Sequence, residues 1–317
     1  MPQLRIGISG WTYVPWRGTF YPEDLPQKKE LWYASRQLNS IEINGSFYSL
    51  QTPSSYRKWY DQTPEGFVLS IKGGRFITHM RRLRNVRPAL ANFFASGVLA
   101  LNEKLGPILW QLPPSMKFDA ALLQSFFDLL PRDTKQAAAL ARRHDDRLKT
   151  RAFMTIDANR PVRHSLEVRH ETFKDPAFIK LLRANNIALV VADTAGKWPY
   201  MEDVTADFVY CRLHGDEELY VSGYTDEALD RWAEKIRGWR RTRDLFVYFD
   251  NDVKVRAPFD AMSLGSKLGL CSAPSDYVDP KSIPELPRRH WPAIQSPRPR
   301  RKSRVRSGIA RRVAAGE

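Results

Sequence analysis

Eight short runs rich in β-branched and aromatic residues recur along the chain, and most of the gaps between them carry helical sequence. The runs are residues 5–11, 40–48, 67–74, 106–113, 164–170, 188–196, 208–215 and 245–252. Strands that alternate with helices pair in parallel, because each helix returns the chain to the start of the next strand. Eight such units in about 270 residues match the normal size of a TIM barrel. The sequence therefore predicts an α/β fold, a single-domain (β/α)8 TIM barrel.

The gaps between these runs predict the helices of the barrel. Helical sequence occupies residues 28–39, 52–60, 88–106, 119–130, 175–186 and 225–239. The gap from 114 to 163 is longer than one crossover needs, so we expect a helical insertion on the barrel wall that includes residues 134–148. A doubly wound open sheet is the competing fold. It is disfavoured because no G-x-G-x-x-G turn follows the first run and no Walker A sequence occurs.

Composition supports a globular chain with a substantial core. Of 317 residues, 43% are hydrophobic and 12% aromatic. No run of eighteen apolar residues and no signal-like N-terminus is visible, so the expected location is cytoplasmic and no membrane partner is expected. The cysteines, Cys211 and Cys271, are too few for a disulfide framework or a zinc cluster, and we expect both to be reduced thiols.

The net charge of +15 is concentrated at the C-terminus. From Arg288 onward the chain has ten basic residues and one acid, which gives this tail a charge of +9. We expect the TIM-barrel domain to span residues 1–275 and residues 276–317 to form a basic, disordered extension. The tail is interpreted either as a solubilising appendage or as an electrostatic arm for nucleic acid, because charge alone does not choose between them.

Polar residues interrupt the predicted strands at alternate positions near their C-terminal ends. They are Glu42, Asn44, Ser70, Lys72, Gln111, Glu167, Arg169, Asp193, Arg212, His214, Tyr248 and Asp250. Parallel barrel strands are normally continuous apolar runs, and alternate side chains share one face. Barrel enzymes place their sites at this end, so we expect one polar ring at the mouth. The alternative is a structural ion-pair network that plugs the barrel.

At these residues the chain resembles the YecE-like family, domain of unknown function 72. The matching segments are residues 6–22, 38–48, 67–83, 105–114, 166–173, 210–215 and 247–264, in the family's order. The resemblance spans residues 4–270 and implies a TIM barrel with the polar residues around its mouth, but no agreed reaction or cofactor. The last segment departs from the family pattern: this chain reads YFDNDVKVRAPFDAM where the family has an asparagine-rich turn.

Three cations on three different strands predict an anion site. Lys72, Arg169 and Arg212 would converge on one phosphate or carboxylate group. The loop GGRFITHMRRLRN after the third run is interpreted as a phosphate-gripping lid, with a solvated basic loop as the alternative. Aromatic residues beside the rim would stack on a base, nucleotide or sugar. The predicted substrate-binding residues are Trp11, Glu42, Asn44, Lys72, Arg75, His79, Gln111, Arg169, Arg212, Tyr248 and Asn251.

The predicted catalytic residues are Glu167, His214 and Asp193. Arg169 would hold Glu167 ionised as a base, His214 would be the acid, and Asp193 would orient one of them. The cofactor is unassigned. A divalent metal is disfavoured because three cations lie among its possible ligands, which are Glu42, Glu167, Asp193, Asp250 and His214. A Schiff base on Lys72 is a further alternative. No Ser-His-Asp elbow or reactive cysteine motif occurs.

Together these features predict an enzyme for a phosphorylated or nucleic-acid-like substrate. The substrate would bind in a polar, cationic pocket at the barrel mouth and undergo acid–base or hydrolytic chemistry, as in a hydrolase or lyase. The rival hypothesis is a non-catalytic nucleic-acid-binding module that uses the mouth and the basic tail together. The expected partner is an anionic small molecule or a nucleic acid, and the oligomeric state is unassigned.

Overall fold

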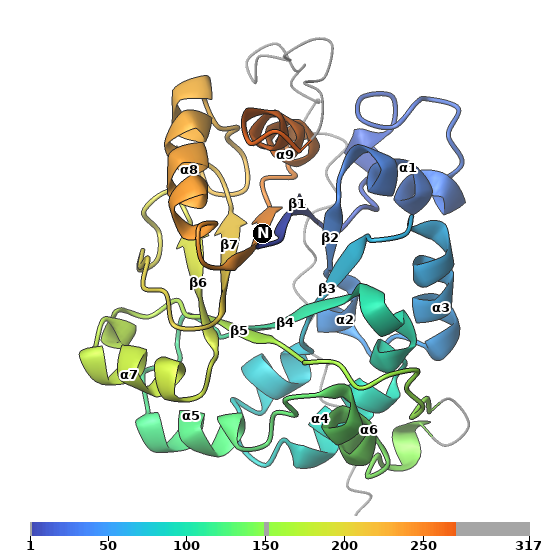
Figure 1. Cartoon of the computed structure of the whole chain (residues 1–317), viewed down its shortest axis with the longest axis vertical. Coiled ribbons are helices and arrows are strands. Elements are labelled where there is room, and N and C mark those ends of the chain that lie inside the picture. The colour runs from blue at the N-terminus through green and yellow to red at the C-terminus, as the bar shows by residue number, and fades with distance from the viewer. Residues whose placement is uncertain (1, 149–151, 271–317) are drawn as a thin grey trace, which may run out of the picture. The chain divides into compact units, whose positions relative to one another are not determined.

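Eight parallel strands form a closed barrel, in which each strand pairs with the next and β8 pairs with β1 (Figure 1). The computed structural model describes residues 2–148 and 152–270. The strands are β1 Leu4–Ser9, β2 Ser40–Ile43, β3 Val68–Lys72, β4 Leu105–Gln111, β5 His164–Glu167, β6 Ala188–Asp193, β7 Phe208–Leu213 and β8 Asp244–Phe249. The predicted TIM barrel is confirmed, and every predicted run contains a strand.

Most strands end earlier than the sequence predicted, because the last residues of a run form loops at the mouth. The run 40–48 contains β2 and a separate short helix, α2 (Gly45–Tyr48). Likewise β5 stops at Glu167, so Arg169 and His170 lie in the loop that follows. Of the polar positions singled out by the sequence, Asn44, Arg169, His214 and Asp250 therefore lie beyond the strand ends, whereas the others remain in the sheet.

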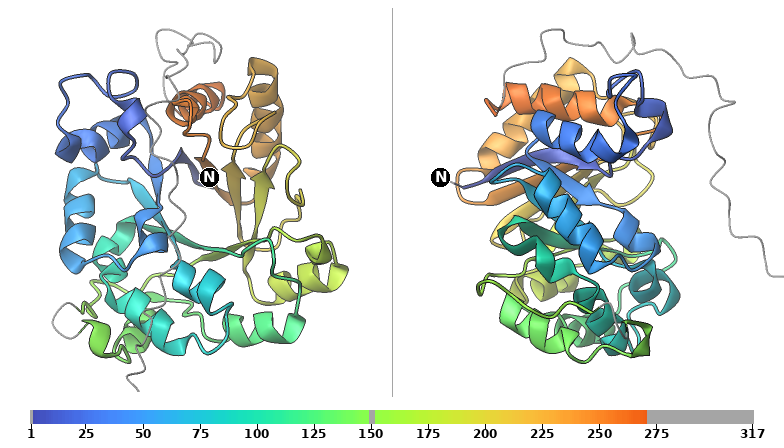
Figure 2. Two further views of the ribbon diagram at one scale, coloured as in Figure 1. Left: turned by 180° about the vertical axis from the view of Figure 1, so that it is seen from behind. Right: turned by 90° about the vertical axis from the view of Figure 1, so that its right-hand side faces the viewer.

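Helices surround the strands on the outside of the barrel (Figures 1 and 2). They are α1 Glu30–Gln37, α2, α3 Pro53–Gln62, α4 Arg87–Ala95, α5 Ala120–Phe127, α6 Thr134–Ala141, α7 Pro176–Ala184, α8 Asp226–Trp239 and α9 Arg256–Lys267. Five of them begin after a threonine or aspartate whose side chain accepts a backbone N–H of the first turn. These local signals explain why α3, α5, α6, α7 and α8 were predictable.

The predicted helical insertion between β4 and β5 is confirmed. One predicted helix is shorter than expected, and one observed helix was not predicted. Helices α5 and α6 both lie in that gap, and α6 packs against α4. The predicted helix 88–106 breaks at Gly97, whose φ is +120°, and continues as a 3-10 turn over Val98–Lys104. Helix α9, which packs against β1 and α8, was not predicted.

The barrel interior is filled by inward-facing side chains below the polar rim. Val68, Leu109, Val190, Tyr210 and Tyr248 belong to this buried cluster. The side chains at the alternate positions of each strand face the helices. Trp110, for example, packs against Phe93 of α4 and Phe126 of α5. The interior below the mouth is therefore a packed core and not a pore.

Some predictions fall outside the described residues. The domain boundary at residue 275, the basic extension 276–317 and Cys271 all do so. Cys211 is buried in β7. Among the described helices, none is long and apolar enough to cross a membrane.

Candidate functional site

Arg212 joins the C-terminal ends of several strands. Its side chain is completely buried, at 0% exposure. Nη1 donates to Glu167 Oε2 at 2.8 Å, and Nη2 donates to Asp250 Oδ2 at 2.7 Å and to Glu42 Oε1 at 3.0 Å. Burial alone would lower the pKa of Arg212, but the three carboxylates hold this pKa well above its usual range. We call Arg212, Glu42, Glu167 and Asp250 the ionic centre.

Two of the carboxylates have both oxygens occupied by protein donors. Glu42 also accepts from the Ser9 hydroxyl at 3.0 Å and from the Tyr210 hydroxyl at 2.6 Å. Glu167 Oε1 accepts from Gln111 Nε2 at 2.8 Å and from Arg169 Nε at 2.7 Å. Burial alone would raise the pKa of Glu167, but Arg169 and Arg212 hold this pKa well below its usual range. Both side chains are therefore held in place by protein donors, and Glu167 is ionised.

His214 is a buried neighbour of the ionic centre. Its Nε2 lies 3.3 Å from Arg212 Nη1, and its Nδ1 lies 3.1 Å from Asp250 Oδ2. Burial, and then the charge of Arg212, lowers the pKa of the imidazole. The ring is thus neutral near pH 7 and lies between two charged partners.

This geometry counts against three predicted roles. Glu167 and His214 are fully buried and engaged, which counts against their use as base and acid. Arg212 was expected to grip the substrate anion, but its guanidinium donates to protein carboxylates, to His214 and to the Ser9 hydroxyl at 3.3 Å. The alternative of a structural ion-pair network therefore describes the floor of the mouth, because a guanidinium with these partners has no donor left for a ligand.

Arg169 and Lys72 are the cations at the outer edge of this network. The Arg169 side chain is 10% exposed, lies over the Trp198 ring at 3.7 Å and donates through Nη2 to the Tyr220 hydroxyl at 3.3 Å. Within the described part of the chain, nothing accepts a hydrogen bond from its Nη1. Lys72 is 8% exposed and its Nζ lies 4.7 Å from the centre of the Phe47 ring.

The loop after β3 has an unusual backbone. It contains the π-helical turn η3 (Phe76–Met80) and three non-glycine residues with positive φ, Arg82 at 49°, Leu83 at 65° and Asn85 at 53°. π-helical turns and such strained residues occur often at functional sites. Gly73, which opens the loop, is needed for packing, since a Cβ there would lie 2.3 Å from the Trp110 ring.

The side chains of this loop are placed differently from one another. Arg75 is exposed, with its guanidinium 5.7 Å from the Tyr48 ring. His79 lies near the mouth, packs edge-on against Phe47 at 5.1 Å and bonds the Thr78 hydroxyl through Nδ1 at 2.9 Å. Burial, followed by the charges of Lys72 and Arg169, lowers the pKa of His79 to about 4. His79 is therefore a neutral imidazole beside Lys72.

Asp252 is a candidate that the sequence analysis missed. Burial, and then the charge of Asp250, raises its pKa to about 7. Burial alone would also raise the pKa of Asp250, but Arg212 and His214 hold it below its usual range. Two neighbouring carboxyl groups with separated pKa values are a pattern typical of acid–base pairs. The sequence did contain a signal for Asp252: it lies two residues after Asp250 in the segment Asp-Asn-Asp that follows β8.

Asp193 does not lie in the mouth, which corrects its predicted place. Ala188, Val190 and Ala192 of β6 face the barrel interior. Because side chains alternate along a strand, Asp193 faces outward, toward the helices. It accepts from the Tyr224 hydroxyl at 3.1 Å. It lines a cavity of about 290 Å³ outside the barrel, together with residues of α8.

Other predicted ligands have structural partners. Tyr248 lies below the mouth, with its hydroxyl 2.7 Å from those of Ser40 and Ser70. Asn251 donates to Ser222 O and to Asp260 Oδ2, and so links the loop between β7 and α8 to α9. Trp11 packs against Trp59 of α3 at 5.5 Å. Gln111 orients Glu167, whereas Asn44 lies at the start of α2 and its buried Oδ1 has no donor among the described residues.

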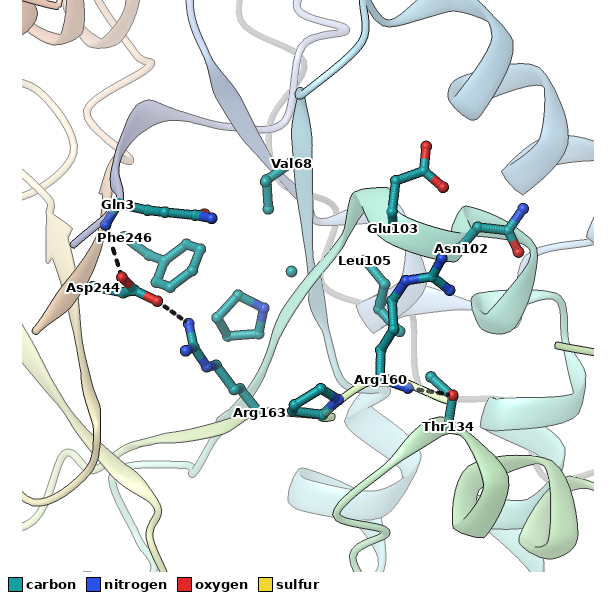
Figure 3. A pocket seen from close by; sticks show the side chains of 13 residues that line it. Gln3, Val68, Asn102, Glu103, Leu105, Thr134, Arg160, Arg163, Asp244 and Phe246 are labelled. Atoms are coloured by element: carbon teal, nitrogen blue, oxygen red, sulfur yellow. Dashed lines mark hydrogen bonds and ion pairs between the residues drawn. The ribbon is translucent and has the colours of Figure 1, made fainter. Parts of the chain in front are cut away.

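A separate cavity of about 240 Å³ lies at the opposite, N-terminal end of the barrel (Figure 3). Two arginines line this cavity. Arg163 forms an ion pair with Asp244 at 2.7 Å, and Arg160 forms an ion pair with Asp157, which does not line the cavity. These arginines are thus committed to protein carboxylates. TIM-barrel enzymes use the other end, so we place the candidate site at the C-terminal mouth.

The fold and this centre define the protein as a TIM barrel with a buried ionic floor at its mouth. The chain belongs to the family described as "Protein of unknown function DUF72", whose model matches residues 5–284. Among the described residues, no group of three or more His, Cys, Asp or Glu side chains is arranged to hold a metal ion.

Relatives and solved structures agree with this assignment. YunF of Bacillus subtilis is 27% identical over 116 residues, which cover 35% of this chain and 40% of YunF. YecE of Escherichia coli O157:H7 is 21% identical over 261 residues, which cover 80% of this chain and 89% of YecE. The crystal structure of a DUF72 family protein from Thermotoga maritima is 23% identical, with a TM-score of 0.69 over 84% of this chain and 99% of that one. These similarities support the fold.

Proposed function

We propose that this protein is an enzyme that binds a phosphorylated or other anionic substrate at the barrel mouth and acts on it by acid–base or hydrolytic chemistry. One observation carries the proposal: Lys72 and Arg169 both present N–H groups for which the described residues supply no acceptor. Partly buried cationic donors without acceptors are unfavourable, and an anionic ligand would supply those acceptors.

Asp250 and Asp252 are the proposed acid–base pair. Asp250 stays ionised beside Arg212, whereas Asp252 exchanges its proton near neutral pH. One carboxylate and one carboxylic acid whose charges interact supply both forms that proton transfer needs. In this proposal they replace Glu167 and His214, which are completely buried, whereas the Asp250 side chain is 12% exposed.

Binding of inorganic phosphate tests the anion site. We expect Arg169→Gln to weaken phosphate binding by about tenfold or more, because a charge-assisted hydrogen bond contributes about 1.5–3 kcal/mol. Isothermal titration calorimetry would measure the change. Arg163→Gln is the matched control, since Arg163 lies at the other end of the barrel and pairs with Asp244. Equal phosphate affinity in the wild-type and Arg169→Gln proteins would contradict the anion site.

A nucleic-acid-binding module is the second candidate function, and exposed aromatic side chains beside the mouth favour it. Tyr48 and Phe76 are exposed, and each has an arginine over its ring: Arg75 at 5.7 Å and Arg147 at 5.4 Å. Bases stack on such rings while arginines bind phosphates. The basic tail, which lies outside the described residues, would add sequence-independent affinity.

Oligonucleotide binding at several salt concentrations tests this candidate. We expect Tyr48→Ser to weaken binding of single-stranded DNA by about 1–3 kcal/mol through lost stacking. A variant with glutamine in place of the ten basic residues after Pro287 should mainly reduce the salt dependence. Complete loss of affinity in the tail variant, with no effect of Tyr48→Ser, would remove the mouth from nucleic-acid binding.

A further inference from the structure

Two buried lysines in this protein have opposite surroundings. Lys104, which is 5% exposed, donates to Tyr60 O at 2.7 Å, to Thr63 O at 2.7 Å and to the Thr63 hydroxyl at 3.2 Å. Lys72 is 8% exposed, yet its ammonium has no hydrogen-bond or ion-pair partner in residues 2–148 and 152–270. The buried ammonium of Lys104 is thus hydrogen-bonded to three oxygen atoms, whereas the ammonium of Lys72 has no such acceptors among the described residues.

The carboxylates near Lys72 are already paired with arginines. Glu42, Glu167 and Asp250 all accept from Arg212, and Glu167 also accepts from Arg169. The Lys72 nitrogen lies over the face of Phe47, 4.7 Å from the ring centre. A buried amine without a hydrogen-bond or ion-pair partner among the described residues is poorly held as an ammonium ion, and such lysines serve as nucleophiles.

The protonation state of Lys72 agrees with this geometry. Burial, and then the charge of Arg212, lowers its pKa to about 8. At pH 7 about a tenth of Lys72 side chains would be neutral amines, against fewer than about one in a thousand for an ordinary lysine. Nucleophilic attack needs this neutral form, which is more populated at pH 7 for Lys72 than for an ordinary lysine.

A proton acceptor lies on the same aromatic ring. His79 packs edge-on against Phe47 at 5.1 Å, and the Lys72 nitrogen lies 4.7 Å from the centre of that ring. The imidazole bonds the Thr78 hydroxyl through Nδ1 and is neutral at pH 7. A neutral imidazole beside an amine can take up and return the protons that addition and dehydration at a carbonyl require.

We propose that the Lys72 amine condenses with an aldehyde or ketone group of the substrate to form an imine, while Arg169 holds the anionic group of the same substrate. The nitrogen lone pair forms a C–N bond with the carbonyl carbon, and the carbonyl oxygen takes a proton to give a carbinolamine. Loss of that oxygen as water, with both amine protons transferred, forms the C=N bond. The choice of a substrate with an anionic group rests on the proposed function, whereas the imine itself does not.

Reductive trapping on the full chain tests the imine. The probes are dihydroxyacetone phosphate and dihydroxyacetone, each with sodium cyanoborohydride, which reduces an imine to a stable secondary amine. Peptide mass spectrometry then locates the adduct. We expect Lys72 to be modified at least about tenfold more than Lys104 or the exposed Lys28, and more by the phosphorylated probe. Lys72→Arg, which keeps the positive charge, should lose this adduct and no other.

The pH dependence of trapping provides a second readout. Labelling of Lys72 should rise about tenfold per pH unit up to about pH 8 and then level off, while labelling of Lys28 keeps rising. The charged and titratable groups that act on Lys72 are Arg212, Asp250, Glu42, Glu167 and His79. A Lys72 profile that parallels that of Lys28 would contradict the inference.

The outcomes separate the imine from the anion site. Modification of Lys72 no greater than that of Lys104 overturns the imine, and phosphate binding that still depends on Arg169 would leave the proposed function standing. Equal labelling of Lys72 by both probes, without competition from inorganic phosphate, supports the imine and overturns the anion site. Because the trapping uses the wild-type chain, failure of a variant to fold does not affect the test.

Discussion

Arg212→Met is expected to lower the free energy of unfolding by about 3–5 kcal/mol, because removing one partner of a buried ion pair leaves uncompensated charge. Arg212 is the shared partner of Glu42, Glu167 and Asp250, and the first two are completely buried. Without the guanidinium these carboxylates would repel one another, in positions where water cannot screen them. Urea unfolding followed by tryptophan fluorescence would measure the loss.

Two further variants show whether the loss comes from the charges. Arg163→Met removes an arginine that is 30% exposed and pairs with Asp244, and should cost about 1 kcal/mol or less. Adding Glu167→Gln and Glu42→Gln to Arg212→Met should recover part of the lost stability, because two of the stranded anions become neutral. A stable single variant Arg212→Met, or no recovery in the combined variant, would contradict this account of the ionic centre.

Acid is expected to unfold the protein steeply below about pH 4, with a loss of several kcal/mol between pH 5 and pH 2. The folded-state pKa values of Glu167 and Asp250 lie below those of the unfolded chain. Their stabilising contribution is therefore fully present above the unfolded pKa values of about 4 and is lost as the pH falls through the lower folded values. The urea midpoint at pH 7, 5, 4 and 3 would show the effect.

Between pH 7 and pH 4 other groups oppose one another. Asp252 and Asp260 have pKa values raised to about 7, so their protonation favours the folded state as the pH falls. His164 and His79, with pKa values lowered to about 3 and 4, disfavour it over the same range, because the unfolded chain takes up protons first. The urea midpoint should therefore change little until about pH 4.

A surface carboxyl provides the control for acid unfolding. Glu171→Gln removes an exposed carboxylate that pairs with Lys174, and should leave the steep region in place. Asp250→Asn removes one of the two responsible groups and should flatten the pH dependence below pH 4. A urea midpoint that stays constant down to pH 3 in the wild-type protein would show that the ionic centre does not govern acid stability.

Much of the fold and part of the site follow from local sequence patterns. Residues within or next to each element encode the strands and the two-helix insertion. The same is true of the side-chain caps that begin α3, α5, α6, α7 and α8. Alternation along a strand also assigned Glu42, Lys72, Glu167, Arg212 and Asp250 to one face, and the structure brings them together. Side-chain parity is a local property, which is why this part could be predicted.

Errors arose where the answer depended on contacts between distant segments. Asp193 was assigned to the mouth because it ends a strand, but the pairing of β6 in the closed barrel turns it toward α8. Asp252 was overlooked because its raised pKa depends on burial and on the position of Asp250. Helix α9 begins at Arg256 without a side-chain cap, so the sequence offered no start signal for it.

The sequence by itself determined that eight parallel strands would carry one polar face to one end of the molecule. Only the tertiary structure decided which of those charges satisfy one another and which remain available to a ligand. Arg212 and Lys72 look alike as cations on inward-facing strand positions, yet the first donates to three carboxylates, whereas the second lies over a phenyl ring and has no hydrogen-bond partner among the described residues. The physical reason is that hydrogen bonding and burial depend on distances of a few ångströms between residues far apart in the chain, which closure of the barrel sets.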